Sequence, residues 1–317
     1  MHSKKKDVII LTPVYNDWQS LNLLIDRLLK LSKCSDLIDA FMIYAINDGS
    51  SIQPDYEKLK NKNLRIINLT HTVGHQKAIT LGLAYVAQNE QCDIVVVMDA
   101  DGEDRPEDIE RLLDECLKQP GKIIFARRSK RKESFMFKFF YALYKFIFKI
   151  LTGEIISFGN FSAVPSILLH KLVRVSAIWN HYSSGVIKSK LPFTKLPIDR
   201  GKRYKGNSKM KFNSFVLHGL SAIAVQIDVV SVRILLATLT VMALAILGIL
   251  IVTGIRMFAE VAVPGWATNV VLGLIIFLMQ TFLISLVLAF IILNYRTQKL
   301  FIPAKDYKDY VLNVEVV

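Results

Sequence analysis

Cysteine is scarce in this sequence. The 317 residues include three cysteines, Cys34, Cys92 and Cys116, an odd number whose spacing does not match a metal-binding cluster. We therefore expect reduced thiols, as in the cytosol, and no functional role for any of the three.

Charge is absent from two long apolar stretches. Residues 234–255 and 270–293 contain no Asp, Glu, Lys or Arg, and each exceeds the roughly 20 residues that a helix needs to cross the hydrocarbon core of a bilayer. The sequence therefore predicts two transmembrane helices and a multi-pass protein of the inner (cytoplasmic) membrane. Thr281 and Ser285 lie four residues apart in the second stretch, a spacing typical of polar side chains that join neighbouring helices.

Basic residues flank these stretches on one side. The loop between them holds one Arg and one Glu, whereas positions 233, 296, 299, 305 and 308 are all Arg or Lys. Because basic loops stay in the cytoplasm, we expect both termini there and the short loop outside. The N-terminus agrees, since its apolar run spans only residues 8–11 and no small-residue cleavage site follows.

Acidic residues are in the minority. Asp and Glu number 27 against 40 Lys and Arg, which gives a net charge of +13 and a pI near 9.5. This balance favours phosphate-bearing partners or an anionic membrane surface. Nucleic acid would fit the charge, but not a hydrophobic share of 52% and a mean hydropathy of +0.35. We therefore expect membrane lipids and no nucleic acid among the partners.

Short apolar runs alternate with helical patterns through the N-terminal region. The runs at 8–11, 41–46, 64–69, 94–98 and 123–126 predict strands, and helical spacing is found at 18–31 and 76–87. Each of the first four strands ends in a polar or glycine-containing loop. We therefore expect an α/β fold with a doubly wound sheet whose strands have their carboxyl ends along one edge. Residues 155–197 show no periodicity from which elements can be predicted.

Two carboxylates, Asp99 and Asp101, directly follow the run at 94–98. Open α/β sheets bind ligands at the carboxyl ends of their strands. Because only Ala100 separates them, both side chains can face one point and hold a divalent cation, Mg²⁺ or Mn²⁺, through oxygen ligands. The alternative is a solvated acidic turn before a helix, since residues 106–108 have the pattern of a helix N-terminus.

Two further segments are amphipathic. Residues 135–151 interleave aromatic side chains with lysines at 138, 145 and 149, which share one helical face, and residues 209–224 form a weaker pattern of this kind. Such helices lie in the headgroup layer of a membrane, although a core helix with extended lysines has the same pattern. Beside two spans, such helices also favour self-association into a homo-oligomer.

Arginines follow the fifth predicted strand at positions 127, 128 and 131, and basic residues recur at 200, 203 and 209. Guanidinium groups match phosphate oxygens, so these residues could hold a lipid phosphate or simply anionic headgroups. Together with a cation at the sheet edge, they indicate a membrane-tethered domain that handles two phosphate-bearing molecules, one soluble and one lipid.

The motifs resemble those of the family 2 glycosyltransferases, more narrowly the polyprenyl-phosphate glycosyltransferases of the bactoprenol glucosyltransferase and dolichyl-phosphate mannose synthase type, with two C-terminal spans. The resemblance covers nearly the whole chain in order. It rests on Thr12–Asp17, Asn47–Ser50, Gly74–Ile79 with Gly82–Leu83, Asp99–Asp101 with Pro106–Glu107, and Arg200 through Gly206–Lys209.

The resemblance implies a GT-A (Rossmann-like) fold and inverting transfer of a sugar from a nucleotide diphosphate, a UDP-sugar being favoured, to a polyprenyl phosphate on the cytoplasmic leaflet. The implied catalytic residues are Asp101, Arg127, Arg128 and Arg200, and the implied metal ligands are Asp99, Asp101 and Glu103. The implied nucleotide pocket is Pro13, Tyr15, Asp17, Asp48, Gln76, Lys77, Asp99 and Ala100. The acceptor phosphate would meet Arg127, Arg128, Arg131, Ser134, Arg200, Arg203, Ser208 and Lys209.

The sequence departs from the family pattern at three places. Asp17 stands where the family usually has Glu, and Asn47 stands where it has a second Asp. Residues 102–106 read Gly-Glu-Asp-Arg-Pro in place of Leu-Gln-Asp-Pro-Pro. Glu103 thus adds negative charge beside the expected cation, and Arg105 adds a positive charge nearby.

We expect four segments. Residues 1–134 would form the nucleotide-sugar-binding core, and residues 135–230 the rest of the catalytic domain with the acceptor loop and interface helices. Residues 231–295 would hold the two spans, and residues 296–317 a cytoplasmic tail. Two alternatives to the polyprenyl-phosphate transferase are a family 2 transferase with a different acceptor and a membrane-anchored binding or scaffold protein whose transferase domain is inactive.

Overall fold

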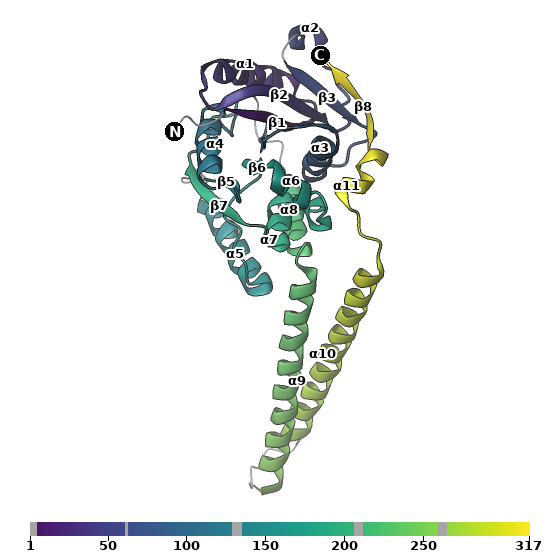
Figure 1. Ribbon diagram of the computed structural model, residues 1–317. Helices are drawn as coiled ribbons and strands as arrows, with labels where there is room; N and C mark the ends of the chain where they lie inside the picture. The colour runs from purple at the N-terminus through teal and green to yellow at the C-terminus, as the bar shows by residue number, and fades with distance from the viewer. Residues whose placement is uncertain (1–4, 61–62, 129–134, 206–211, 259–264) are drawn as a thin grey trace. The chain divides into compact units, whose positions relative to one another are not determined.

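A computed structural model describes the chain over residues 5–60, 63–128, 135–205, 212–258 and 265–317 (Figure 1). Contacts divide the chain into two compact units. The larger comprises residues 1–145, 155–225 and 300–317, and the smaller comprises 146–154 and 226–299. This division differs from the four segments expected from the sequence, chiefly because residues 300–317 belong to the larger unit.

Four parallel strands form the centre of the larger unit. They lie in the order β4 (Ile94–Val97), β1 (Lys6–Val14), β2 (Ile38–Asn47) and β3 (Leu64–Leu69). Parallel neighbours need crossover connections, which contain α1 (Trp18–Cys34), α2 (Tyr56–Leu59) and α3 (His75–Asn89). The turn η1 (Pro106–Asp108) and α4 (Ile109–Lys118) follow β4. The predicted βα units and the α/β class are confirmed.

The complete sheet is mixed rather than parallel. Its order is β7-β5-β6-β4-β1-β2-β3-β8, in which β6 (Ser162–Pro165) runs antiparallel between β4 and β5 (Ile123–Arg128). At one edge β7 (Phe193–Ile198) pairs parallel with β5, and at the other β8 (Val311–Val316) pairs antiparallel with β3. The sequence analysis predicted none of β6, β7 and β8.

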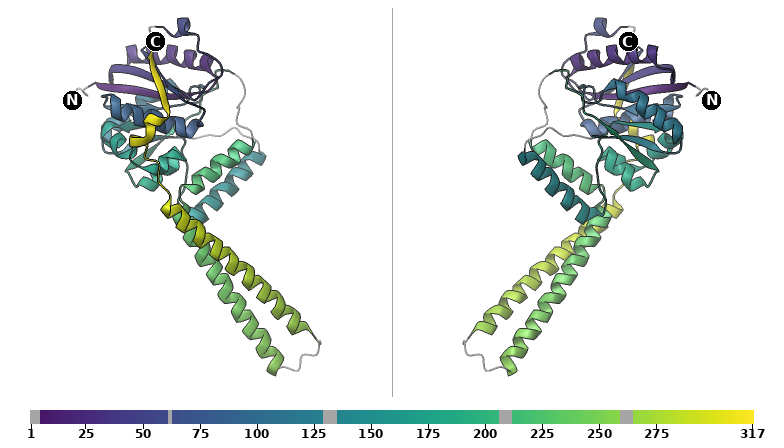
Figure 2. Two further views of the ribbon diagram at one scale, coloured as in Figure 1. Left: turned by 90° about the vertical axis from the view of Figure 1, so that its right-hand side faces the viewer. Right: turned by 90° about the vertical axis from the view of Figure 1, so that its left-hand side faces the viewer.

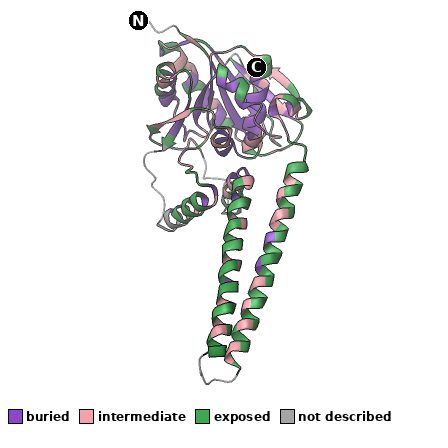
Figure 3. Ribbon diagram, turned by 60° about the horizontal axis from the view of Figure 1, so that its bottom comes forward, coloured by how far each residue is buried: buried purple, intermediate pink, exposed green. Residues whose placement is uncertain are grey.

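Side chains of the central strands alternate between two apolar layers. Val8 and Ile10 of β1 pack in the layer that includes α1 and α4, whereas Ile9 and Leu11 pack in the layer that includes α3. A sheet covered on both faces requires apolar residues at successive positions. In agreement with this, β4 has no polar side chain and is buried at all four of its positions. Figure 3 shows the buried residues gathered within the larger unit.

Five shorter helical elements complete the larger unit's α3 side and C-terminal end: α6 (Ser166–Leu172), η2 (Ser176–Trp179), α7 (Tyr182–Ser189), α11 (Pro303–Asp306) and η3 (Tyr307–Asp309). The expected amphipathic segments are helices, α5 (Phe135–Thr152) and α8 (Phe212–Ala224). A Cβ at Gly219 of α8 would lie 3.0 Å from the ring of Tyr144 on α5, so these two helices pack closely. Ser184 Oγ of α7 donates to the carbonyl of Ala222 at 2.9 Å and joins α8 to α7.

Two long helices form most of the smaller unit, α9 (Ile227–Phe258) and α10 (Trp266–Thr297), and they lie side by side (Figure 2). Each has 32 residues, which gives a length of about 48 Å at 1.5 Å per residue. Most of their large apolar side chains are exposed. Ser285 Oγ donates to Thr238 Oγ1 at 2.8 Å, which confirms the interpretation of Ser285 as a residue that joins the helices. By length and composition both helices can cross a membrane.

Candidate active site

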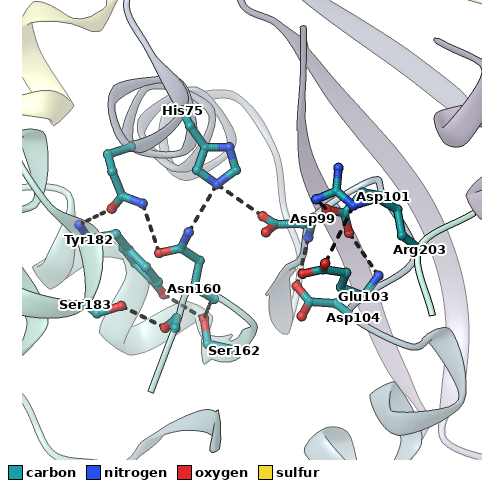
Figure 4. A network of polar contacts seen from close by, with 12 residues as sticks. His75, Asp99, Asp101, Glu103, Asp104, Asn160, Ser162, Tyr182, Ser183 and Arg203 are labelled. Carbon is teal, nitrogen blue, oxygen red and sulfur yellow. Dashed lines mark hydrogen bonds and ion pairs between the residues drawn. The ribbon is translucent and has the colours of Figure 1, made fainter. Parts of the chain in front are cut away.

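A tight acidic turn follows β4 (Figure 4). The backbone N–H of Asp99 donates to Asp104 Oδ2 at 3.0 Å, and the N–H of Glu103 donates to Asp101 Oδ1 at 2.9 Å. Gly102 has φ +88°, a conformation that favours glycine. Burial and the neighbouring charge of Asp99 raise the pKa of Asp101. The turn therefore concentrates several carboxylates, and the charge of Asp99 disfavours ionisation of Asp101.

Two arginines from residues 199–205 balance this charge. Arg203 Nη2 lies 2.6 Å from Asp101 Oδ2 and its Nε lies 3.6 Å from Glu103 Oε1, while Arg200 pairs with Glu103 Oε2. The structure thus brings together four of the predicted site residues from positions about a hundred apart in sequence. Arg105 does not join this group, because its guanidinium pairs with Asp108 at 2.7 Å.

A second polar network reaches the turn from α3 and α7. His75 Nε2 lies 3.1 Å from Asp99 Oδ1 and 3.1 Å from Asn160 Nδ2 (Figure 4). Gln76 Nε2 donates to Asn160 Oδ1 at 3.2 Å and accepts at its Oε1 from the N–H of Tyr182 at 2.8 Å. Burial alone would lower the pKa of His75. The charges of the Asp99, Asp104 and Asp101 carboxylates outweigh burial, so the pKa of His75 is raised above its usual value.

Two members of this network, His75 and Asn160, were not predicted from the sequence as site residues. His75 lies in the motif Gly74–Ile79 but was given no role of its own, and Asn160 falls in residues 155–197, for which no element was predicted. For His75 a signal existed, since it opens a helix after β3 and the ends of the parallel strands lie along one sheet edge. No such signal existed for Asn160. It lies before β6, not after it, and reaches the same sheet edge because β6 runs antiparallel to β4.

Asp48 supports a loop with its carboxylate. It is buried, and its oxygens accept from the N–H groups of Val73 at 2.7 Å and Gly74 at 3.0 Å. Burial raises the pKa of Asp48. Because Gly74 directly precedes α3, this carboxylate places the helix that carries His75 and Gln76.

The other expected nucleotide-pocket residues lie at the ends of β1, α3 and β4. Pro13 is buried in β1, and Tyr15 is 49% exposed just beyond it. Asp17 precedes α1, where its carbonyl accepts from the N–H of Leu21 at 3.2 Å and its side chain does not cap the helix. Lys77 Nζ lies 4.9 Å from the centre of the Trp179 ring. Gln76 takes part in the network above, and Ala100 is buried within the acidic turn.

Arg127 and Arg128 are the last two residues of β5, and they lie beside the start of the 199–205 segment. Arg127 is exposed and pairs in register with Pro197, as Arg128 does with Ile198. The end of β5 thus places the backbone of Arg127 and Arg128 beside the residues that precede Arg200. The side chain of Arg128 and residues Arg131, Ser134, Ser208 and Lys209 lie outside the described part of the chain.

The donor set fits a divalent cation by chemistry. Asp99 and Asp101 offer hard oxygen atoms, and the mutual repulsion of the carboxylates is what a cation would relieve. Within the described ranges, no group of three His, Cys, Asp or Glu side chains converges in metal-binding geometry. Guanidinium groups neutralise Asp101 and Glu103 instead.

Comparison with known proteins bears on both family and fold. The model of the family described as glycosyl transferase family 2 matches residues 9–167. The chain is 30% identical over 135 residues to undecaprenyl-phosphate 4-deoxy-4-formamido-L-arabinose transferase of Photorhabdus laumondii, across 41% of this chain and 39% of that protein. It is 25% identical over 278 residues to the uncharacterized glycosyltransferase YkcC of Bacillus subtilis, across 84% of this chain and 82% of that protein. The chain therefore covers about two fifths of the length of the Photorhabdus protein.

Among solved structures, glucosyl-3-phosphoglycerate synthase from Mycobacterium tuberculosis, in complex with Mn²⁺, UDP-glucose and phosphoglyceric acid, matches with a TM-score of 0.52. The match has 14% sequence identity and covers 71% of this chain and 79% of that chain. At this identity the similarity shows the fold alone. The GT-A fold that the family resemblance implies is therefore confirmed, and its sheet is mixed.

Proposed function

The chain belongs to glycosyl transferase family 2, and we propose that it transfers a sugar, with inversion, from a nucleotide diphosphate to a polyprenyl phosphate at the cytoplasmic leaflet. The observation that carries this proposal is the acidic turn after β4 with Arg200 and Arg203 on its carboxylates. It combines side chains suited to a cation with side chains suited to a phosphate. The two apolar helices supply the membrane attachment that a lipid acceptor requires.

The names of similar proteins support both substrates. A relative acts on undecaprenyl phosphate, and a structural neighbour was solved with UDP-glucose and Mn²⁺. We therefore favour a UDP-sugar as donor and Mg²⁺ or Mn²⁺ as cofactor. Asp99 and Asp101 would hold the cation, which when bound supplies positive charge to the departing diphosphate.

The remaining side chains would bind and orient the two substrates. Pro13, Tyr15, Asp17 and Gln76 would line the nucleotide pocket, whereas Asp48 would shape it through Val73 and Gly74 rather than contact the nucleotide. The exposed Arg127, together with Arg200 and Arg203, would hold the acceptor phosphate. A phosphate monoester is already ionised at neutral pH, so it needs no strong general base, and positioning and charge stabilisation would do most of the catalysis.

The membrane arrangement follows from charge. We propose that α9 and α10 cross the inner membrane, with the loop between them outside and both termini in the cytoplasm. Helices α5 and α8 would then lie in the headgroup layer, where the lysines of α5 can meet lipid phosphates.

The test is to incubate membranes containing the chain with a panel of nucleotide sugars and undecaprenyl phosphate, and to identify the glycolipid by mass spectrometry. We expect one donor to yield a polyprenyl-phosphate sugar in a metal-dependent reaction. Asp101→Asn should reduce the yield by roughly a hundredfold or more, whereas Asp114→Asn, in an exposed pair with Lys118, should not. Nucleotide binding without glycolipid from any donor would favour the alternative of an inactive binding protein.

A further inference from the structure

Residues 199–205 dock on the acidic turn through their main chain. The N–H of Gly201 donates to the carbonyl of Glu103 at 2.8 Å, and the N–H of Tyr204 donates to the carbonyl of Asp101 at 2.8 Å. A Cβ at Gly201 would lie 2.4 Å from the carbonyl oxygen of Gly102, so no larger residue fits there without movement. The segment is therefore seated on the turn at a defined register.

Tyr204 fills the space above Gly102. A Cβ at Gly102 would lie 2.8 Å from the Tyr204 ring, so this packing depends on glycine at position 102. The ring also contacts Arg27, whose guanidinium lies 5.5 Å from the ring centre and donates to the hydroxyl at 3.2 Å. Gly102, which stands where the family pattern has Leu, thus packs against Tyr204 of the 199–205 segment.

Glu103 has its partners in the same segment. Its side chain is 14% exposed, its Oε2 pairs with Arg200, and its Oε1 lies 3.6 Å from Arg203 Nε. Its carboxylate is therefore directed at two guanidinium groups. Asp101, in contrast, meets Arg203 through Oδ2 alone, while its Oδ1 accepts from a backbone N–H of the turn.

We infer that Glu103 is a positioning residue, which holds Arg200 and Arg203 ready for the acceptor's phosphate and is not a ligand of the cation. This inference rests on the proposed function and gives Glu103 a different role from the one that the family resemblance implies. An arginine has five N–H donors in a planar fork, so a carboxylate that pairs with part of the fork orients the whole group toward a phosphate. The cation would then be held by Asp99 and Asp101.

The experiment compares Glu103→Gln with the wild-type chain in detergent. Glutamine keeps the size of the side chain and removes its charge, so the arginines lose their anchor while an oxygen stays in place. Two measurements are made, the dissociation constant for Mn²⁺ alone by electron paramagnetic resonance, and the rate of tryptic cleavage after Arg200, Lys202, Arg203 and Lys205 by mass spectrometry. Glu115→Gln on α4 is the matched control, since Glu115 accepts from the side chain of Gln119 just beyond the helix.

We expect Glu103→Gln to weaken Mn²⁺ binding by less than about tenfold, because the cation loses a nearby negative charge but no ligand. Cleavage should accelerate by roughly tenfold, because opening of a segment sets its cleavage rate. The double variant Glu103→Gln/Arg200→Gln should be cleaved no faster than the faster single variant, because Arg200→Gln removes an ion pair that Glu103→Gln has already broken. With an identified donor, the KM for polyprenyl phosphate should rise roughly tenfold while kcat and the KM for the donor stay near wild type. A role in folding alone would not produce that split.

A loss of Mn²⁺ affinity of more than about tenfold with unchanged cleavage would overturn the inference, because that is how a metal ligand behaves. If the wild-type chain binds no Mn²⁺, cleavage alone decides, faster cleavage supporting the inference and unchanged cleavage overturning it. Should Glu103→Gln fold poorly, Arg200→Gln gives the same cleavage test from the other side of the ion pair. Absence of glycolipid with every donor would contradict the proposed function but would not change the cleavage result. The glycolipid assay therefore tests the proposed function, and the cleavage assay separately tests whether Glu103 holds the arginines.

Discussion

Arg203→Gln should tighten the binding of Mn²⁺. Arg203 is 23% exposed and its Nη2 lies 2.6 Å from Asp101 Oδ2, so a cation on Asp101 would lie about 5 Å from the guanidinium. A divalent ion at that distance from a unit positive charge is repelled by about 2 kcal/mol in a water-like dielectric and by about 7 kcal/mol at an effective dielectric of about 20. Even the smaller value corresponds to more than a tenfold change in affinity.

The assay is a titration of the detergent-solubilised chain with Mn²⁺, in which electron paramagnetic resonance measures the free ion. The dissociation constant of Arg203→Gln should fall at least tenfold at low ionic strength and by less at high salt, because salt screens partly exposed charges. Arg111→Gln is the matched control, since Arg111 pairs with Asp108 at 3.1 Å and does not contact Asp101 or Glu103. An unchanged or weaker affinity in Arg203→Gln would refute the assignment of Asp101 as the cation's ligand.

Three further predictions concern stability and reactivity. Asp48→Ala removes the carboxylate that accepts from the N–H groups of Val73 and Gly74. The free energy of unfolding, measured by thermal unfolding, should fall by about 2–4 kcal/mol, and it should fall less in Asp48→Asn, whose amide oxygen still accepts. Gly82→Val places a Cβ 2.7 Å from a side chain of β2 and should cost about 1–3 kcal/mol, whereas Gly121→Ala, which meets nothing within 4 Å, should be neutral; equal melting temperatures would contradict this. Burial raises the pKa of Cys116 to about 12, so at pH 8 it is almost entirely the unreactive thiol; mass spectrometry after maleimide treatment should find label on the exposed Cys34 long before Cys116, and equal rates would disprove the burial argument.

Local patterns predicted the elements whose structure depends on their own residues. The uncharged stretches in α9 and α10 and the apolar run of β4 could be recognised because each carries its hydrophobic pattern within one short segment. Strands β6 and β7 could not be predicted, since both lie in a region without periodicity. Strand β8 was missed because its six residues, Val311–Val316, follow the second span, where a tail was expected. What holds β8 in place is pairing with β3, a partner far away in sequence.

The amino-acid sequence by itself determined the family, the acidic pair after β4 and the two apolar helices, because each of these is a property of residues that are close together in the chain. Only the tertiary structure decided what the carboxylates contact. Asp101 and Glu103 meet arginines about a hundred residues away, and Asp99 meets His75 at the start of α3. Those partners depend on the order of strands in the sheet and on the register at which the 199–205 segment docks, and neither is specified by any local pattern.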